Sequence, residues 1–291
     1  MCIMNKEYVI ISDNTCDLPD NIYKQLGLKI MCLSYTMGGV EYSEDNALSI
    51  SEFYAKMREG EMTKTSQITR EDIEKTFTEA LNNGFDILYI GFSSGLSGSY
   101  DSARIAAEEL SPKYPDSKIR TVDSLCASIG EGLFVYKAAQ MKKEGKSIDE
   151  VYQWCEDNKL HLCHMFTVND LMFLHRGGRV SKASAIAGSI LGIKPILHVD
   201  NEGHLIPIGK IRGRKQSLEA LVNEMDKRLG NYKNDTIGIS HGDCIEDAEY
   251  VKKLIEKKYG IKNFIINHVG PVIGSHSGPG TIALFFLGEY R

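Results

Sequence analysis

The hydrophobic residues in the first half of the chain lie in short apolar runs. Runs at residues 8–12, 87–90 and 119–123 are each followed by a polar loop and then by a segment with helical spacing of apolar positions. Strands buried on both faces give continuous apolar runs of this kind, and helices connect such strands when they are parallel. The pattern predicts an α/β fold with a mostly parallel sheet and helices on both of its faces.

The second half of the chain combines the same alternation with a hairpin. Apolar runs at 194–199 and 204–211 flank an Asp-Asn-Glu-Gly sequence at 200–203, which is typical of a tight turn between antiparallel strands. A helix of small residues is expected over 183–191. We therefore predict a mixed or antiparallel sheet in this half.

The length of the chain fits two domains. One hydrophobic core rarely serves more than about 250–300 residues, and this chain has 291. We expect an N-terminal α/β domain over 1–162 and a C-terminal α/β domain over 163–291. Small-molecule sites are often found between domains, so we expect a ligand in the cleft between these two.

Charge and hydropathy exclude several classes of protein. The formal net charge of −5 at pH 7 disfavours nucleic acid, which needs a basic surface. The longest apolar run, 282–287, is too short to cross a bilayer, so we expect no transmembrane segment and at most transient membrane contact. Seven scattered cysteines without a C-x-x-C motif indicate reduced thiols, and residues 1–7 lack the apolar stretch of a signal peptide. We therefore expect a cytoplasmic protein.

A segment rich in serine and glycine, residues 91–100, directly follows the apolar run that ends at Ile90. It contains four serines and three glycines where a strand should lead into a helix. Backbone N–H groups and hydroxyls in such a turn suit an anion. No lysine follows the glycines, which argues against a nucleoside-triphosphate loop and makes a carboxylate the better ligand.

Three further segments carry polar side chains that could lie at a site. Residues 63–67 form a hydroxyl-rich stretch that we expect to be a loop, and Arg176 and Arg179 flank a pair of glycines. His276 lies in the stretch 270–280, which glycines and prolines should hold as a rigid loop. Each segment also has an ordinary explanation as a linker, a surface turn or a structural loop.

The segment 210–215 concentrates positive charge in an acidic protein. It contains Arg212 and Arg214 and precedes a predicted helix. Such a run is either a solvated face or a docking patch for an acidic partner or a phosphate, and the sequence favours neither.

One hypothesis for function is a serine hydrolase or esterase. Residues 91–95 match G-x-S-x-G, the nucleophile elbow of α/β-hydrolases. Ser93 would attack the substrate, His276 would act as the base, and Asp243 would orient the histidine, in the chain order that this fold requires. The pattern is short and arises by chance, so we keep this function as the alternative.

A metal site is a weaker hypothesis. His161, Cys163 and His164 are close in sequence, but the alternation of side chains along a strand would place neighbours on opposite faces. No second pair lies at ligand spacing. We expect a core thiol and two ordinary histidines here, with no metal and no cofactor.

The other main hypothesis is a carrier that holds a small amphiphilic acid without reacting with it. The hydroxyls of Thr65 and Ser97 would bind the carboxylate, and an apolar slot would accept the tail. Burial of each methylene is worth about 0.8 kcal/mol, so a chain of roughly fifteen contributes on the order of 12 kcal/mol before ordering costs. The tail would dominate affinity, and the hydroxyls would orient the head group.

Five motifs along the chain support the carrier, at residues 12–19, 65–67, 95–100, 177–181 and 270–280. In this order and spacing they together resemble the DegV family of bacterial fatty-acid-binding proteins. The resemblance extends over essentially the whole chain.

The resemblance implies a two-domain α/β protein that binds a long-chain fatty acid such as palmitate, without a covalent bond, between its domains. It also implies an acyl-carrying subunit that presents the carboxylate to a partner ATP-dependent fatty acid kinase. The acyl phosphate formed there enters phospholipid synthesis. The family's head-group threonine and serine fall on Thr65 and Ser97, and Arg179 and His276 complete the polar end.

Other residues follow from the resemblance less directly. Ile68 stands where the family often has proline, so Ser94 or Ser66 is a candidate to share the carboxylate. Arg212 lies in a basic segment similar to one implicated in kinase contact, and we add Arg176 and Arg214 as docking candidates. Phosphoryl transfer needs a phosphate cradle and a metal, so we predict no turnover by this chain alone.

Overall fold

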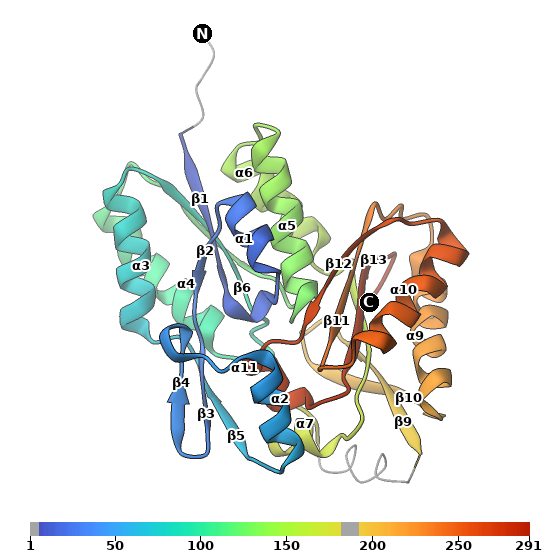
Figure 1. Cartoon of the computed structure of the whole chain (residues 1–291). Helices are drawn as coiled ribbons and strands as arrows, with labels where there is room; N and C mark the ends of the chain where they lie inside the picture. Colours follow the sequence, from blue (N-terminus) through green and yellow to red (C-terminus); the bar gives the residue numbers. More distant parts are fainter. Residues whose placement is uncertain (1–5, 182–191) are drawn as a thin grey trace.

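The computed structural model of the protein describes residues 6–181 and 192–291. The helix expected over 183–191 lies outside these residues. Within them the strands form three sheets, of four, three and six strands. The four- and three-stranded sheets come from the N-terminal part of the chain, and the six-stranded sheet contains the strands from Leu162 onwards (Figure 1).

The four-stranded sheet is parallel and confirms the prediction for the first half of the chain. Its strands are β1 (Tyr8–Asp13), β2 (Lys29–Met31), β6 (Asp86–Gly91) and β7 (Ile119–Asp123). They lie in the order β2-β1-β6-β7, and each neighbouring pair is parallel. All six residues of β6 are buried, as expected of a strand covered on both faces.

Helices cover both faces of this sheet. Side chains alternate along β6, so that Ile87 and Tyr89 face one layer of helices and Leu88 and Ile90 face the other. The first layer contains α3 (Arg70–Asn82) and α4 (Ser99–Leu110). The second contains α1 (Asp20–Leu26), α5 (Ile129–Lys143) and α6 (Ile148–Asn158).

The three-stranded sheet is antiparallel and corrects one prediction. It consists of β3 (Ser34–Met37), β4 (Val40–Tyr42) and β5 (Thr63–Ser66). The hydroxyl-rich stretch that we expected to be a loop is therefore mostly strand, and it pairs with β3. Alternation along β5 half-buries its two threonines and leaves the other two residues exposed. Helix α2 (Ile50–Arg58) packs its aromatic residues beside this sheet.

The six-stranded sheet is mixed, as predicted for the second half. It contains one parallel pair, β11 with β12, and its other neighbouring pairs are antiparallel. The predicted hairpin at 200–203 joins β9 to β10. In spatial order the strands are β10 (Leu205–Arg212), β9 (Ile193–Val199), β8 (Leu162–Thr167), β13 (Ile282–Leu287), β11 (Thr236–His241) and β12 (Asn263–His268).

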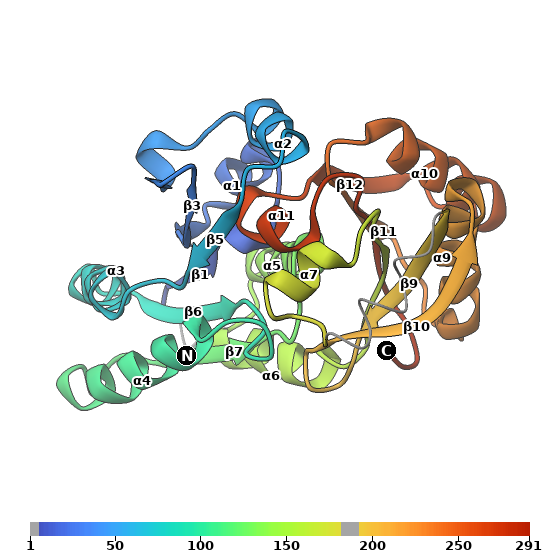
Figure 2. The same cartoon turned by 90° about the horizontal axis from the view of Figure 1, so that it is seen from below.

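Among the residues described, two long helices and two short ones accompany the six-stranded sheet. α9 (Arg214–Leu229) and α10 (Ile245–Tyr259) cover the outer face of the six-stranded sheet. α7 (Met172–Arg176) and α11 (Pro271–Ser277) lie side by side near the centre of the molecule (Figure 2). The stretch 270–280 is therefore a short helix with flanking turns rather than a loop. Short 3-10 helices occur at Asn14–Cys16, Glu44–Asn46 and Ser111–Lys113.

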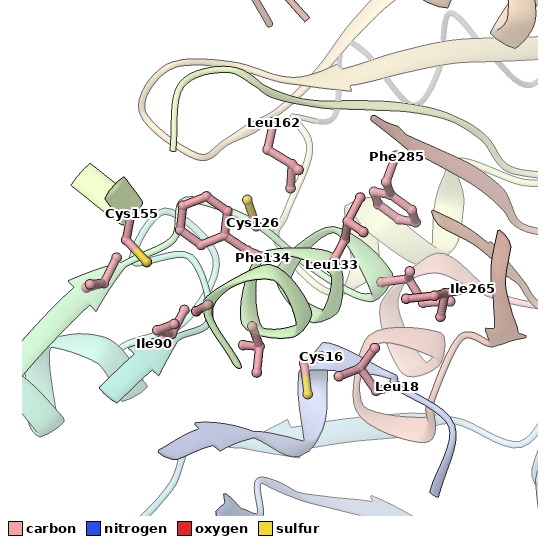
Figure 3. Close-up of a cluster of buried hydrophobic side chains, with 14 of the residues drawn as sticks. Cys16, Leu18, Ile90, Cys126, Leu133, Phe134, Cys155, Leu162, Ile265 and Phe285 are labelled. Atoms are coloured by element: carbon pink, nitrogen blue, oxygen red, sulfur yellow. The ribbon is translucent and has the colours of Figure 1, made fainter. Parts of the chain in front are cut away.

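Helix α5 packs between the four-stranded and six-stranded sheets. Figure 3 shows its Leu133 and Phe134 within one hydrophobic cluster that contains Ile90 from β6 and Phe285 from β13. Nine of the residues in α5 are buried, so the helix has no solvent-facing stripe over much of its length. Gly132 lies in this helix directly against the backbone of Cys16, and a methyl group there would overlap the Cys16 carbonyl oxygen.

We predict that Gly132→Ala destabilises the protein by about 1–3 kcal/mol, because α5 must move away from Cys16 to make room. Alanine is intrinsically the better helix former, so a loss of stability isolates the steric effect. Urea unfolding followed by circular dichroism measures the change. In the matched control Gly209→Ala, the new methyl group has only Ile196 nearby, at 3.8 Å, and stability should change by less than about 0.5 kcal/mol. Equal stability of the two variants would contradict this account of the packing.

Candidate functional site

A partly open cavity of about 250 Å³ lies between the N-terminal sheets and the inner face of the six-stranded sheet. It exceeds an engineered apolar cavity of about 150 Å³ that admits benzene, so it has room for an apolar ligand. Leu33, Phe92 and Leu96 line it from the N-terminal part of the chain. Phe166 and Phe285 line it from the six-stranded sheet.

The cavity is where the fold of the parallel sheet places ligands. From β1 the chain passes to β2 on one side, whereas β6 lies on the other side of β1. The loops that follow β1 and β6 therefore diverge, and such a point at the carboxyl ends of strands leaves a crevice. The serine and glycine segment follows β6, and its residues 96–98 line the cavity, as the sequence suggested.

Four polar residues, which we call the polar cluster, gather at this cavity: Thr65, Ser97, Arg179 and His276. Thr65 Oγ1 is 2.8 Å from His276 Nε2, and this contact joins β5 to α11. The structure thus brings two segments together that lie 211 residues apart in sequence. Gly177 allows this approach, because a Cβ atom there would overlap the imidazole of His276.

Ser97 lies at the amino end of α4. Its Oγ is 3.0 Å from Ser99 Oγ and accepts a hydrogen bond from the Ser99 N–H group at 3.3 Å. Gly98, the residue before the helix, lines the cavity as well. The amino end of a helix carries partial positive charge, so α4 adds to the attraction for an anion at this position.

Arg179 supplies the positive charge of the polar cluster. Its Nε and Nη2 atoms donate to the carbonyl oxygen of Leu96 at 3.2 and 2.9 Å. It takes part in no salt bridge within residues 6–181 and 192–291. Burial and the nearby Arg179 charge lower the pKa of His276 to about 4, so the imidazole is neutral at pH 7. The cluster therefore presents a single cation together with neutral hydrogen-bonding groups.

Several other predicted residues lie away from the cavity. Ser94 and Ser66 are exposed and are not among the lining residues, so they are poorly placed to share a ligand's head group. Arg176 and Arg212 are exposed, as a docking role requires. Arg214 instead donates to Asp247 Oδ2 at 2.7 Å and to the carbonyl oxygen of Gly280 at 2.8 Å, so it has an internal structural role.

The structure does not assemble the catalytic triad of the hydrolase hypothesis. Ser93 is fully buried, and its hydroxyl donates to the carbonyl oxygen of Gly203 at 3.0 Å. His276 pairs with Thr65, and Asp243 forms an ion pair with Arg58. The three residues therefore have separate partners.

The candidate metal ligands are also separated. Cys163 Sγ contacts the carbonyl oxygen of Tyr290 at 3.1 Å, whereas His164 accepts from the Ala127 N–H group on the cavity side of the sheet. His161 Nδ1 lies 2.9 Å from the carbonyl oxygen of Gly288. In the part of the chain that the structure describes, no group of three histidine, cysteine or acidic residues could hold a metal ion.

A set of buried polar residues lies beside the cavity. Asp13 accepts from the Tyr89 hydroxyl and the Phe92 N–H group, and burial raises its pKa to about 7. Asp17 is also buried, its pKa is likewise raised to about 7, and it accepts a hydrogen bond from Ser128. Glu131 of α5 accepts from two more hydroxyls. No local pattern marks Ser128 or Glu131, because their surroundings come from distant strands.

A protein-family model covers nearly the whole chain. The family model described as "Uncharacterised protein, DegV family" matches residues 7–289. The chain belongs to the DegV family. A DegV domain-containing protein of Clostridium perfringens is 48% identical over 288 residues, which cover 98% of this chain and 99% of that protein. The DegV domain-containing protein YteA of Lactococcus lactis is 36% identical over 286 residues, or 96% and 97% of the two chains.

Solved structures of DegV proteins share the fold over nearly the whole chain. A fatty-acid-binding DegV family protein from Thermus thermophilus has a TM-score of 0.86 at 28% identity, covering 97% of this chain and 99% of its own. DegV of Bacillus subtilis, a fatty acid binding protein, has a TM-score of 0.81 at 28% identity with the same coverage. A Thermotoga maritima protein whose structure revealed a fatty acid binding function has a TM-score of 0.83 at 29% identity, again with the same coverage. These neighbours confirm the predicted family and the α/β fold.

The length and hydropathy of a helix decide whether it can cross a bilayer. None of the helices within residues 6–181 and 192–291 is long and apolar enough to cross a membrane.

We predict that Arg179→Gln raises the pKa of His276 from about 4 towards the ordinary value of about 6.5, because it removes a neighbouring cation and opens the site to water. In the parent protein the folded-state pKa is the lower one, so His276 costs stability as the pH falls from about 6.5 to about 4, and the variant should lose less. NMR titration of the imidazole measures the pKa. The exposed Arg176 provides the control Arg176→Gln, which should leave it unchanged. An unaltered His276 pKa in Arg179→Gln would show that Arg179 does not act on the imidazole.

Proposed function

We propose that this chain binds one long-chain fatty acid, such as palmitate, in the cavity and without a covalent bond. The observation that carries this proposal is a mostly apolar cavity with the polar cluster among its lining residues. The fatty acid binding of the DegV proteins from Thermus thermophilus and Bacillus subtilis supports it. The ligand would then lie between an N-terminal domain, residues 1–162, and a C-terminal domain, residues 163–291.

The carboxylate would lie at the polar cluster. Thr65 and Ser97 would donate hydrogen bonds to its oxygens, and Arg179 would supply the opposite charge. Hydrogen bonds to a charged group are worth more than those between neutral groups, about 1.5–3 kcal/mol each. His276 would hold Thr65 in place through the 2.8 Å contact, so that the threonine hydroxyl has a fixed position.

The alkyl chain would lie against the apolar walls. Leu96 and Phe92 approach from the loop after β6, and Phe166 and Phe285 from the six-stranded sheet. Each buried methylene contributes about 0.8 kcal/mol, so the tail supplies most of the affinity and the polar cluster sets the orientation.

We further propose that the chain is a carrier without catalytic activity of its own, and that a partner ATP-dependent fatty acid kinase phosphorylates the bound carboxylate. The polar cluster supplies one cation, whereas phosphoryl transfer also needs a nucleotide site and a metal, which the partner would bring. The acyl phosphate would pass to phospholipid synthesis. Exposed Arg176 and Arg212 are our candidates for docking, and Arg214 is withdrawn because it is engaged internally. The free thiols of the six described cysteines support a cytoplasmic location.

We predict that the double variant Thr65→Ala and Ser97→Ala keeps its fold but binds palmitate at least about tenfold more weakly, because two hydrogen bonds to a charged carboxylate are lost. Isothermal titration calorimetry measures the affinity. Native mass spectrometry of the parent protein should show a palmitate mass that denaturation removes. A covalent adduct that survives denaturation and maps to Ser93 would favour the hydrolase instead.

The matched control is the double variant Ser66→Ala and Ser94→Ala, which removes neighbouring hydroxyls that do not line the cavity. It should bind palmitate as the parent does. If both double variants bound equally tightly, the assignment of the carboxylate to Thr65 and Ser97 would be wrong.

We predict that Arg176→Glu and Arg212→Glu weaken the use of the palmitate-loaded protein by a purified fatty acid kinase subunit, because each reverses a charge on the docking surface. The KM for the loaded protein should rise about tenfold or more, with palmitate affinity unchanged. Lys253, an exposed residue of α10, provides the control Lys253→Glu. Unchanged kinase kinetics in both arginine variants would remove Arg176 and Arg212 from the docking surface.

A further inference from the structure

Ser240 places a hydroxyl group in the cavity wall beside two apolar residues. It lies on β11 directly opposite Ala283 of β13, and Ala283 lies opposite Phe166 of β8. All three residues line the cavity. Among the residues that the structure describes, Ser240 is hydrogen-bonded to Ser128 and to no member of the polar cluster, so we treat it as a separate polar feature.

Ser240 is the end of a short hydrogen-bonded chain that begins at a buried acid. Ser128 Oγ lies 3.0 Å from Ser240 Oγ and is also hydrogen-bonded to Asp17 Oδ2. Ser128 and Ser240 both line the cavity, and Asp17 lies behind them. Ser128 has a φ of 55°, a conformation that costs energy in residues other than glycine, so the surrounding structure holds its hydroxyl in this position.

The hydrogen bonds that link Asp17, Ser128 and Ser240 leave Ser240 with unused hydrogen-bonding capacity. Ser128 has one hydroxyl proton, which it can give either to Asp17 or to Ser240. If Ser240 accepts this proton, its own O–H group is free to donate; if Asp17 accepts it, lone pairs of Ser240 are free. A hydroxyl group can donate or accept, so a hydroxyl on a ligand would fit Ser240 in both cases.

Ser277 adds a second hydroxyl to the cavity lining. It is 5% exposed, and its Oγ has no hydrogen-bond partner among the residues that the structure describes. The other polar residues nearby are already used. Thr281 donates to carbonyl oxygens of α11 and the residue after it, and both ring nitrogens of His164 have backbone partners. An apolar tail would leave the capacity of Ser240 and Ser277 unmet, which is costly in a buried site.

We propose that Ser240, supported by Ser128 and Asp17 and assisted by Ser277, forms a subsite for a hydroxyl group carried on the acyl chain. The inference rests on the proposed function, because it assigns the substrate class of the same cavity: long-chain fatty acids with a hydroxyl along the chain, bound in addition to unsubstituted ones. The carboxylate stays at the polar cluster, and the subsite binds the hydroxyl group of the acyl chain.

The test compares octadecanoic acid with its 3-, 6-, 10- and 12-hydroxy derivatives. For each derivative, calorimetry gives the ratio of its Kd to the Kd of octadecanoic acid, which cancels effects common to both ligands. For at least one hydroxyl position, Ser240→Ala should raise this ratio about fivefold, and the double variant with Ser277→Ala should raise it further. Affinity for octadecanoic acid itself should stay equal or become tighter.

The control Ser217→Ala removes a buried hydroxyl that is bonded to Arg214 within α9 and does not line the cavity. It should leave every ratio unchanged. Ratios in Ser240→Ala that equal those of the parent at all four positions would overturn the subsite while leaving fatty acid binding intact. Failure of the parent protein to bind octadecanoic acid would overturn the proposed function and the subsite together.

Discussion

The packing of α5 between two sheets is the constraint on which the cavity depends. The amino end of this helix is bonded to both sides: Glu131 accepts from Ser12 of β1 and from Thr15 just beyond it, and Ser128 pairs with Ser240 of β11. Apolar contacts surround the middle of the helix, so it cannot slide without exposing apolar surface or opening voids. It thereby fixes the four-stranded sheet against the six-stranded sheet, and the cavity lies between the loop after β6 and the inner face of the six-stranded sheet.

The polar cluster carries a single positive charge, which would suit one negative charge on a ligand. Arg179 is held by the carbonyl oxygen of Leu96 and keeps its charge, whereas His276 is neutral because burial and the guanidinium both oppose its protonation. A second cation would add charge repulsion when no ligand is bound, and it would attract a dianion more strongly than a carboxylate. The apolar walls lower the local dielectric constant, which would strengthen the attraction between Arg179 and a bound anion. In the proposed function, the charge and the apolar walls would together favour a monoanion with an apolar body.

The parts of the fold that the sequence predicts well are those whose burial is uniform. β6 is covered on both faces, so its apolar run identifies it without further information. β5 has no apolar residue, and it is a strand only because β3 offers it a partner. Helix α11 was missed for a related reason: glycine, proline and serine dominate it, and its helical conformation depends on its position between β5 and α7.

The residues of the candidate site also differ in how well the sequence predicts them. Thr65, Ser97 and His276 lie in segments whose composition marks them, whereas Ser240 is one of two hydroxyl residues in β11, and only its pairing with Ala283 and Ser128 places it at the cavity. For Arg214, the sequence suggested a docking role that the structure does not support. A run of basic residues shows how many positive charges lie close together in the sequence. A partner can use only those charges that do not form ion pairs with acidic residues nearby in the folded protein. Asp247 neutralises Arg214 from a helix that lies beyond another strand, and only the folded arrangement reveals this pairing.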